Sequence, residues 1–132
     1  MKKKRTAGII LIVLIMVFMI TGCSKYKSHY NAVGFVHSNT SKSAFMDFYT
    51  FEGQIVFTVK CKSGGSIDYS AKLEKGSLTV YYDCDGTKRE LLTISGGEKV
   101  NSTIENLPKS EVYIIVKTDG KCKNGALEFD VK

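Results

Sequence analysis

Apolar side chains recur at every second position along short runs in the C-terminal part of the chain. Ile55, Phe57, Val59 and Cys61 form one such run. A period of two places alternate side chains on one face of a β-strand, and no stretch here repeats at the helical period. The expected strands are residues 44–51, 55–61, 67–73, 78–82, 91–94, 100–105, 112–116 and 127–131. About eight short, evenly spaced strands predict an all-β fold, either an antiparallel β-sandwich or a barrel.

Glycine-containing pairs interrupt these runs. The pairs are Glu52-Gly53, Lys75-Gly76, Asp85-Gly86, Asp119-Gly120 and Asn124-Gly125. Glycine adopts the positive φ that tight turns require, so we expect the chain to reverse direction at or beside these pairs.

The closing segment has the cadence of a known class of module. Its parts are, in order, Ile104-x-x-Leu107, the turn Pro108-Lys109-Ser110-Glu111, the run Val112-Tyr113-Ile114-Ile115-Val116 and Gly125-x-Leu127-x-Phe129. This order is similar to the last strands of jelly-roll modules in bacterial secreted proteins, including pre-peptidase C-terminal and carbohydrate-binding modules. The resemblance implies a jelly-roll-like sandwich but no particular activity, because sandwiches carry many unrelated functions.

The chain begins with an export signal. Lys2, Lys3, Lys4 and Arg5 precede an apolar run over residues 7–20, as in a secretory signal peptide. A helix of that length spans only about 21 Å at roughly 1.5 Å per residue. Because a bilayer core is about 30 Å thick, a permanent membrane span is the weaker alternative.

The four residues after this run, Ile20-Thr21-Gly22-Cys23, resemble the lipobox of bacterial lipoproteins. The resemblance implies that the Cys23 thiol receives a diacylglycerol group and that a peptidase removes residues 1–22. It implies no other cofactor. Cys23 would then be the first residue of the mature protein and its anchor, since two or three acyl chains hold a protein stably on a membrane. An uncleaved signal anchor with an incidental cysteine is the alternative.

Residues 23–43 are polar and show no sustained period, so we interpret them as the lipidated Cys23 followed by a tether. Both histidines, His29 and His37, lie in this segment, where Gly34-Phe35-Val36 is long enough only for a short edge strand. The globular domain is predicted to cover residues 44–132.

The charge balance excludes nucleic acid as a partner. The full chain carries +6, but four of its positive charges precede residue 6. Residues 23–132 hold 15 Lys or Arg against 13 Asp or Glu, a net charge of +2. That excess supplies no concentrated patch for neutralising phosphates.

Three cysteines remain once Cys23 is assigned to the lipid, so at least one of them has no partner within the chain. Counting strands up and down places Cys61 and Cys84 at the same end of the sandwich, which favours a Cys61–Cys84 disulfide. One miscounted strand would favour Cys84–Cys122 instead. Three free thiols, with Cys61 buried like a small apolar residue, are an equally good interpretation.

No constellation in the sequence supports catalysis or metal binding. Asp83, Asp85 and Glu90 do not have the spacing of a calcium loop, and a hairpin turn explains Asp85-Gly86 better. Neither histidine belongs to the predicted domain, so a Ser/His/Asp site has no base. The carboxylates considered for glycoside hydrolysis are Asp47, Asp68, Glu74, Glu90 and Glu105, and their spacing singles out no pair.

Tyrosines offer the remaining signal for a ligand. Tyr81, Tyr82 and Tyr113 are candidates for stacking against a glycan, although Tyr81 and Tyr82 must point to opposite faces of their strand. We therefore expect a lipoprotein on the extracytoplasmic face of a bacterial cell membrane, with a non-catalytic domain that binds a glycan or an envelope protein. The alternative is an envelope enzyme or accessory subunit that acts on cell-wall or glycan material.

Overall fold

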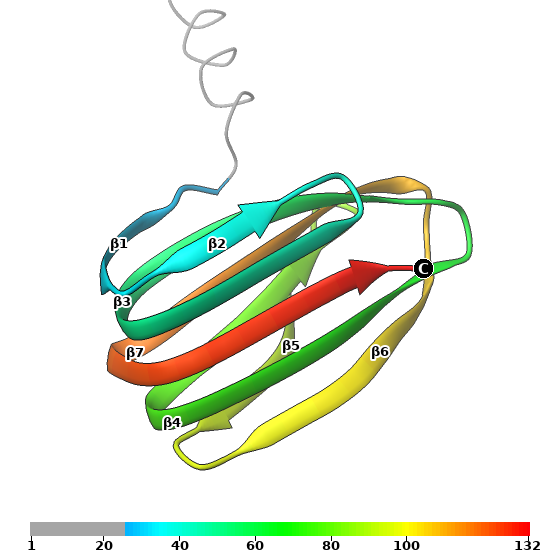
Figure 1. Ribbon diagram of the computed structural model, residues 1–132. Helices are drawn as coiled ribbons and strands as arrows, with labels where there is room; N and C mark the ends of the chain where they lie inside the picture. The colour runs from blue at the N-terminus through cyan, green and yellow to red at the C-terminus, as the bar shows by residue number, and fades with distance from the viewer. Residues whose placement is uncertain (1–25) are drawn as a thin grey trace, which may run out of the picture.

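Three long, bent strands build most of the protein. The computed structural model describes residues 26–132, which form seven antiparallel strands and no helix (Figure 1). The strands are β1 His29–Val33, β2 Val36–Asn39, β3 Ser43–Cys61, β4 Gly65–Asp83, β5 Arg89–Ser95, β6 Lys99–Leu107 and β7 Ser110–Val131. The fold is therefore an all-β, jelly-roll-like antiparallel sandwich, as the sequence predicts.

Each of the three long strands corresponds to two predicted strands joined end to end. β3, β4 and β7 pass through Gly53, Gly76 and Gly120, where the sequence predicts interruptions. Instead of reversing, the backbone bulges there, with register shifts beside Gly53 and Gly76. All three glycines have positive φ, which a bulge requires as much as a turn does. Joining these three pairs reduces the eight predicted strands to five, and β1 and β2 bring the number to seven.

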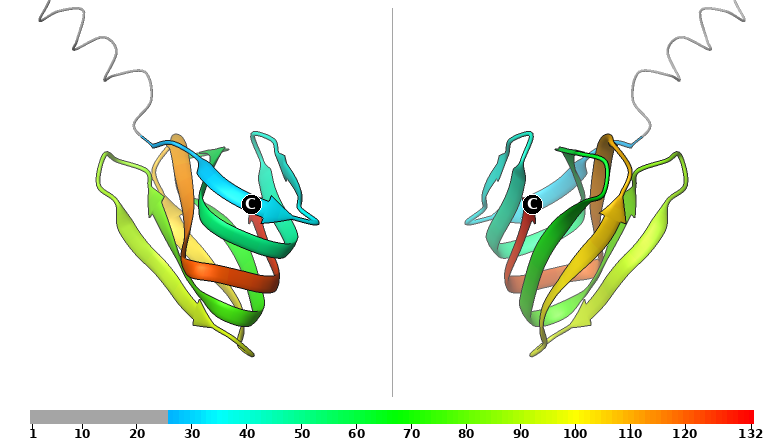
Figure 2. Two further views of the ribbon diagram at one scale, coloured as in Figure 1. Left: turned by 90° about the vertical axis from the view of Figure 1, so that its left-hand side faces the viewer. Right: turned by 90° about the vertical axis from the view of Figure 1, so that its right-hand side faces the viewer.

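The bends divide the molecule into two layers, which Figure 2 shows from the side. The front layer, nearest the viewer in Figure 1, contains β2, β6, and residues 43–51 of β3, 65–75 of β4 and 122–131 of β7. The back layer contains β5 and the other halves of these three strands. β1 pairs with residues 50–54, at the bend of β3. In both layers β7 lies between β3 and β4.

The core lies between the layers and follows the predicted alternation. Ile55, Phe57, Val59 and Cys61 all point inward, and each exposes at most 5% of its surface. Phe48, Leu127 and other apolar side chains of the front layer join them in one buried cluster. Inward apolar residues of both layers thus supply the burial that stabilises the fold.

The predicted tether is wrong over β1 and β2. Both strands pair antiparallel with β3, which would otherwise expose an unpaired edge. Ala32 and Phe35 also pack against the core. Local composition gives no sign of this pairing, because the partner residues on β3 lie farther along the chain. Residues 1–22 and Cys23 lie outside the described residues. Within residues 26–132, no helix is long and apolar enough to cross a membrane.

Candidate functional site

The three predicted glycan-facing tyrosines lie on two different sides of the back layer. Tyr82 points inward and packs against the core, while its neighbour Tyr81 points outward, as their adjacent positions require. Tyr113 shares the outer surface with Tyr81, because Tyr113 pairs with Asp83, two residues beyond Tyr81 on β4. All three rings are half-buried. They form no single exposed platform.

The outer surface of the back layer is covered by the segment that precedes β1. The hydroxyl of Tyr26 donates a hydrogen bond to Oδ2 of Asp83 at 2.6 Å, and the Tyr26 ring meets Tyr113 edge-on with centroids 5.5 Å apart. Asp83 is only 2% exposed, and its Oδ1 also accepts the backbone N–H of Gly86 at 2.7 Å. On this same surface Ile115 is 0% exposed. The part of this surface around Asp83 and Tyr113 is therefore covered by the chain itself.

The acidic loop between β4 and β5 is held by its own hydrogen bonds. The two terminal nitrogens of Arg89, Nη1 and Nη2, each donate a hydrogen bond of 3.0 Å to the Asp85 carboxylate. Hydrogen bonding from Arg89 is the main cause that lowers the pKa of Asp85. The carboxylates of Asp83 and Asp85 therefore stabilise the turn that the sequence predicts at Asp85-Gly86. Among residues 26–132, no three His, Cys, Asp or Glu side chains are grouped as a metal site would require.

The three cysteines within residues 26–132 are free thiols in this structure, the alternative that the sequence supports equally, and no Cys61–Cys84 disulfide is formed. Cys61 ends β3 and Cys84 directly follows β4, at the same end of the back layer, but β7 lies between these strands. Two strand spacings amount to about 10 Å, whereas a disulfide joins Cα atoms about 4.4–6.8 Å apart. Cys122 lies away from both, at the bend, where its Sγ donates to the Ser77 carbonyl at 3.2 Å. Burial is the main cause that raises the pKa of all three thiols.

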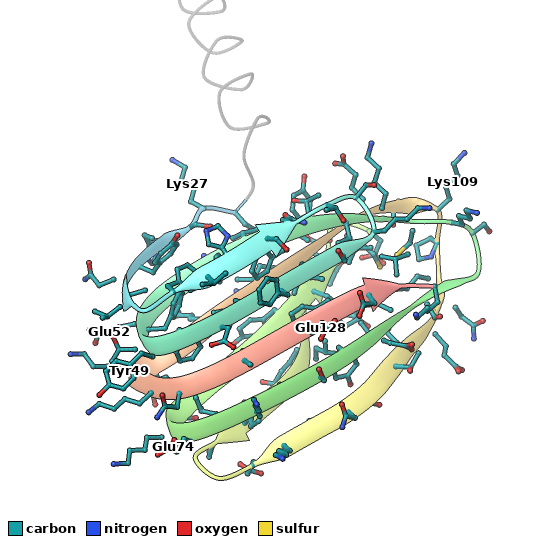
Figure 3. The ribbon with its side chains drawn as sticks, in the orientation of Figure 1. Lys27, Tyr49, Glu52, Glu74, Lys109 and Glu128 are labelled. Atoms are coloured by element: carbon teal, nitrogen blue, oxygen red, sulfur yellow. The ribbon has the colours of Figure 1, made fainter. Side chains whose placement is uncertain are left out.

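The outer surface of the front layer presents a grid of polar side chains. Antiparallel partners point to the same side of a sheet, so the strand register defines rows across β3, β7, β4 and β6. The rows are Asp47–Ala126–Lys72–Lys99, then Phe45–Glu128–Ser70–Asn101, then Ser43–Asp130–Asp68–Thr103. Figure 3 shows Glu128 near the middle of this surface.

Small side chains hollow the centre of this grid. Ala126 and Ser70 stand diagonally beside each other on neighbouring strands, between longer side chains on both sides. Three open recesses of about 390, 420 and 460 Å³ share lining residues here, and we call them together the front recess. Its lining residues include Phe45, Asp47, Asp68, Ser70, Lys72, Lys99, Asn101, Thr103, Ala126, Glu128 and Asp130.

The front recess offers hydrogen-bonding groups of both kinds. Lys72 and Lys99 are donors, the carboxylates are acceptors, and Asn101 is both. Asp68 already accepts a hydrogen bond of 2.7 Å from the Thr103 hydroxyl. Phe45, half-buried, adds the one aromatic ring among the outward side chains of the three rows. These donors and acceptors match the hydrogen-bonding groups of a molecule rich in hydroxyl or amide groups.

Sequence reasoning considered Asp47, Asp68 and Glu74 as carboxylates but found nothing to single them out. It missed Phe45, Glu128 and Asp130 altogether. The available signal was phase: Leu127 and Phe129 point inward, so Ala126, Glu128 and Asp130 must point outward together. Which outward faces remain open could not be known without the path of residues 26–28.

No protein-family model matches the sequence, and no curated protein matches it. Solved structures do share the fold at low sequence identity. The carbohydrate-binding module TmCBM61, solved with β-1,4-galactotriose, is 15% identical, with 80% of this chain and 87% of that chain covered and a TM-score of 0.48. The pre-peptidase C-terminal domain of a Bacillus anthracis collagenase is 18% identical (72% and 91% covered, TM-score 0.48). Aeromonas hydrophila PliG, a periplasmic inhibitor of g-type lysozyme, is 16% identical (70% and 88% covered, TM-score 0.47). The chain is similar to these small β-sandwich proteins in fold alone.

Proposed function

We propose that this protein is a bacterial lipoprotein whose β-sandwich domain binds an oligosaccharide in the front recess without transforming it. Diacylglycerol on Cys23 holds it on the extracytoplasmic face of the cell membrane. The observation that carries the proposal is the contrast between the two outer surfaces. The protein's own Tyr26 covers the back surface, while the front surface stays open and is hollowed along its centre.

The chemistry of the front recess fits a sugar. Each sugar hydroxyl is both a donor and an acceptor, and the carboxylates of Asp47 and Glu128 together with the Asn101 amide meet both needs. A sugar ring also has an apolar face, which an aromatic side chain such as Phe45 can contact. The ammonium groups of Lys72 and Lys99 add donors at one end of the recess.

The same geometry favours binding over hydrolysis. A general acid in a glycosidase is sheltered from water, because burial keeps a carboxylic acid protonated near neutral pH. Asp47 and Glu128 are both exposed to solvent. Asp68 is committed to Thr103. These side chains are suited to hold hydroxyl groups rather than to exchange protons with a leaving group.

Sugar binding is tested by calorimetric titration of the acylated full chain, in detergent, with chito-oligosaccharides, and by co-sedimentation with purified peptidoglycan. We expect binding that weakens at least about tenfold in the double variant Phe45→Ala/Glu128→Gln, because the ring contact and a charged acceptor are both lost. The matched control is Tyr49→Ala/Glu52→Gln, which removes an exposed ring and an exposed carboxylate from the same strand outside the front recess (Figure 3). No binding to either probe, or equal weakening in both variants, would contradict the proposal.

Lipidation is tested separately by mass spectrometry of the membrane-bound protein. We expect a mature N-terminus at Cys23 carrying diacylglycerol, and accumulation of unprocessed precursor in the Cys23→Ala variant. An intact, unmodified Met1 in the membrane fraction would overturn the anchor and leave the sugar-binding experiment unaffected.

A further inference from the structure

The exposed apolar side chains of the protein gather at one corner. Among residues 26–132, the large apolar residues that remain exposed are Tyr30 (37%), Val33 (62%), Val36 (61%) and Tyr49 (54%). Val33 and Val36 flank the turn between β1 and β2, and Tyr49 lies beside that turn, where its N–H bonds to the Gly34 carbonyl. Exposed apolar groups that cluster in this way mark a surface that meets an apolar partner.

Charge is unevenly distributed along the sequence. The chain contains no Asp or Glu before Asp47, and all 13 acidic residues follow from there. Between Cys23 and residue 46 the charged residues are Lys25, Lys27 and Lys42. Residues 47–132 hold 12 Lys or Arg against these 13 acids, a net charge of −1. Residues 23–46 are therefore basic, while Asp47 and Glu52 lie opposite Val36 and Asn31 on the neighbouring strand β3.

The chain leaves little slack between the proposed lipid and this edge. Cys23 lies three residues before Tyr26, a reach of at most about 11 Å in an extended chain. Tyr26 is fixed to the domain through Asp83 and Tyr113. From there the chain runs about 23 Å along the edge to Val33, at roughly 3.3 Å per residue. An anchor at Cys23 thus holds Tyr26, at the start of this edge, within about 11 Å of the lipid headgroups.

We propose that the edge formed by residues 26–39, with Lys42 beside it, lies on an anionic membrane surface. This inference rests on the proposed lipidation of Cys23. Val33 and Val36 enter the interfacial region, and Lys27 and Lys42 face the lipid phosphates. Figure 3 shows Lys27 at the upper edge, and in Figure 1 β1 descends from that edge to the β1–β2 turn at the left of the molecule.

Tryptophan fluorescence tests this orientation, because the chain contains no Trp. The acylated full chain is reconstituted in vesicles of phosphatidylcholine and phosphatidylglycerol, with a single reporter from Val33→Trp or Val36→Trp. Glu74→Trp, at an exposed position on β4 that Figure 3 shows at the lower edge, away from Lys27, is the matched control. For the first two reporters we expect blue-shifted emission and quenching by spin-labelled lipids. For the control we expect neither. Equal, solvent-like emission from all three would overturn the proposal.

Amine labelling of the unsubstituted chain supplies a second readout that no new side chain can bias. We expect Lys27 and Lys42 to be labelled about fivefold more slowly on phosphatidylglycerol-containing vesicles than on pure phosphatidylcholine, the factor that about 1 kcal/mol of attraction implies. Lys75 and Lys121, exposed at the bends of β4 and β7, should not change. Protection that also occurs without vesicles and grows with protein concentration would assign the edge to a second copy of the chain instead. Failure of lipidation is distinct, because it removes the acyl mass and the membrane association together.

Discussion

The outer surfaces of the two layers are built by the same three strands, but they differ in the side chains that point outward and in whether the N-terminal segment covers them. In the back layer β7 points Tyr113 and Ile115 outward, the Tyr26 ring lies against Tyr113, and Ile115 is 0% exposed. In the front layer the same strand points Ala126 and Glu128 outward, and nothing in residues 26–132 lies over them. The outer surface of the back layer contributes to stability, and the outer surface of the front layer is open to solvent.

The comparison shows that a bend lets one strand carry two chemistries. Along β7 the outward positions change from aromatic and aliphatic to small and acidic once the strand has passed Gly120. The inward positions remain apolar on both sides, with Val116 and Leu127 both buried. The core is therefore shared, while each outer surface is specified by its own half of the strand.

The largest effect is expected from a substitution at the bend, because both outer surfaces depend on the strands that pass through it. In Gly76→Ala the new Cβ would lie 2.7 Å from Sγ and 2.9 Å from Cα of Cys122, at a φ of +100°. We expect a loss of about 3 kcal/mol in the free energy of unfolding, measured by urea denaturation.

Gly120→Ala is the control for this change. Gly120 also has positive φ, at +76°, but a Cβ there meets nothing within 4 Å. Backbone strain alone should cost about 1 kcal/mol. Equal losses in the two variants would mean that the contact with Cys122 relaxes and that the close packing at the bend is not required.

The next change acts on the back surface alone. Tyr26→Phe removes the hydroxyl that donates to the buried Asp83 and keeps the ring against Tyr113. We expect about 1.5 kcal/mol lower stability, the typical contribution of a hydrogen bond to a charged group, with chito-oligosaccharide affinity unchanged. Tyr49→Phe should be neutral, because the Tyr49 side chain is exposed. A loss of sugar binding in Tyr26→Phe would show that the two surfaces are coupled.

A complementary change acts on the front surface alone. Ala126→Phe fills the centre of the front recess from a half-exposed strand position. Stability should stay within about 0.5 kcal/mol, as for most surface substitutions, while sugar binding is lost. Titration of this variant together with its urea denaturation curve separates the two effects. Binding that survives would place the ligand elsewhere.

The smallest expected effect concerns repulsion within the front surface. Asp130 and Asp68 are direct antiparallel partners, and like charges opposite each other destabilise a sheet. Asp130→Asn should therefore raise the free energy of unfolding by about 0.5 kcal/mol. The gain should shrink as salt is added, because the repulsion between two partly exposed charges is screened. A salt-independent change would point to a cause other than charge.

Much of the fold could be predicted because alternation is a local property. The inward phase of Ile55, Phe57 and Val59 is written in the sequence and holds in the structure. Glycine was ambiguous, since Gly53 supplies positive φ to a bulge while Gly86 supplies it to a turn. Contacts across the sheet decide that Gly53 forms a bulge rather than a turn. There the N–H of Gly53 donates a hydrogen bond to the Thr118 hydroxyl at 2.9 Å.

The candidate site was harder to predict than the fold. An outward Glu128 looks the same in sequence whether its surface is open or covered, and only the path of the N-terminal segment distinguishes the two cases. The aromatic signal was misleading for the same reason. Tyr81 and Tyr113 are aromatic residues on a shared surface. However, the Tyr26 ring already packs against Tyr113, and the Lys88 ammonium lies over the Tyr81 ring.

The central place of β7 has a consequence for how the chain is made. β3 and β4 are not neighbours in either layer, and Ser43 at the start of β3 pairs with Asp130, almost at the end of the chain. The sandwich therefore cannot close until its last strand has been synthesised, and such long-range pairing makes folding slow. A chain whose sandwich stays open until β7 has been synthesised remains unfolded and can pass through a narrow channel. The proposed export route needs that property, because the polypeptide must cross the membrane before it folds.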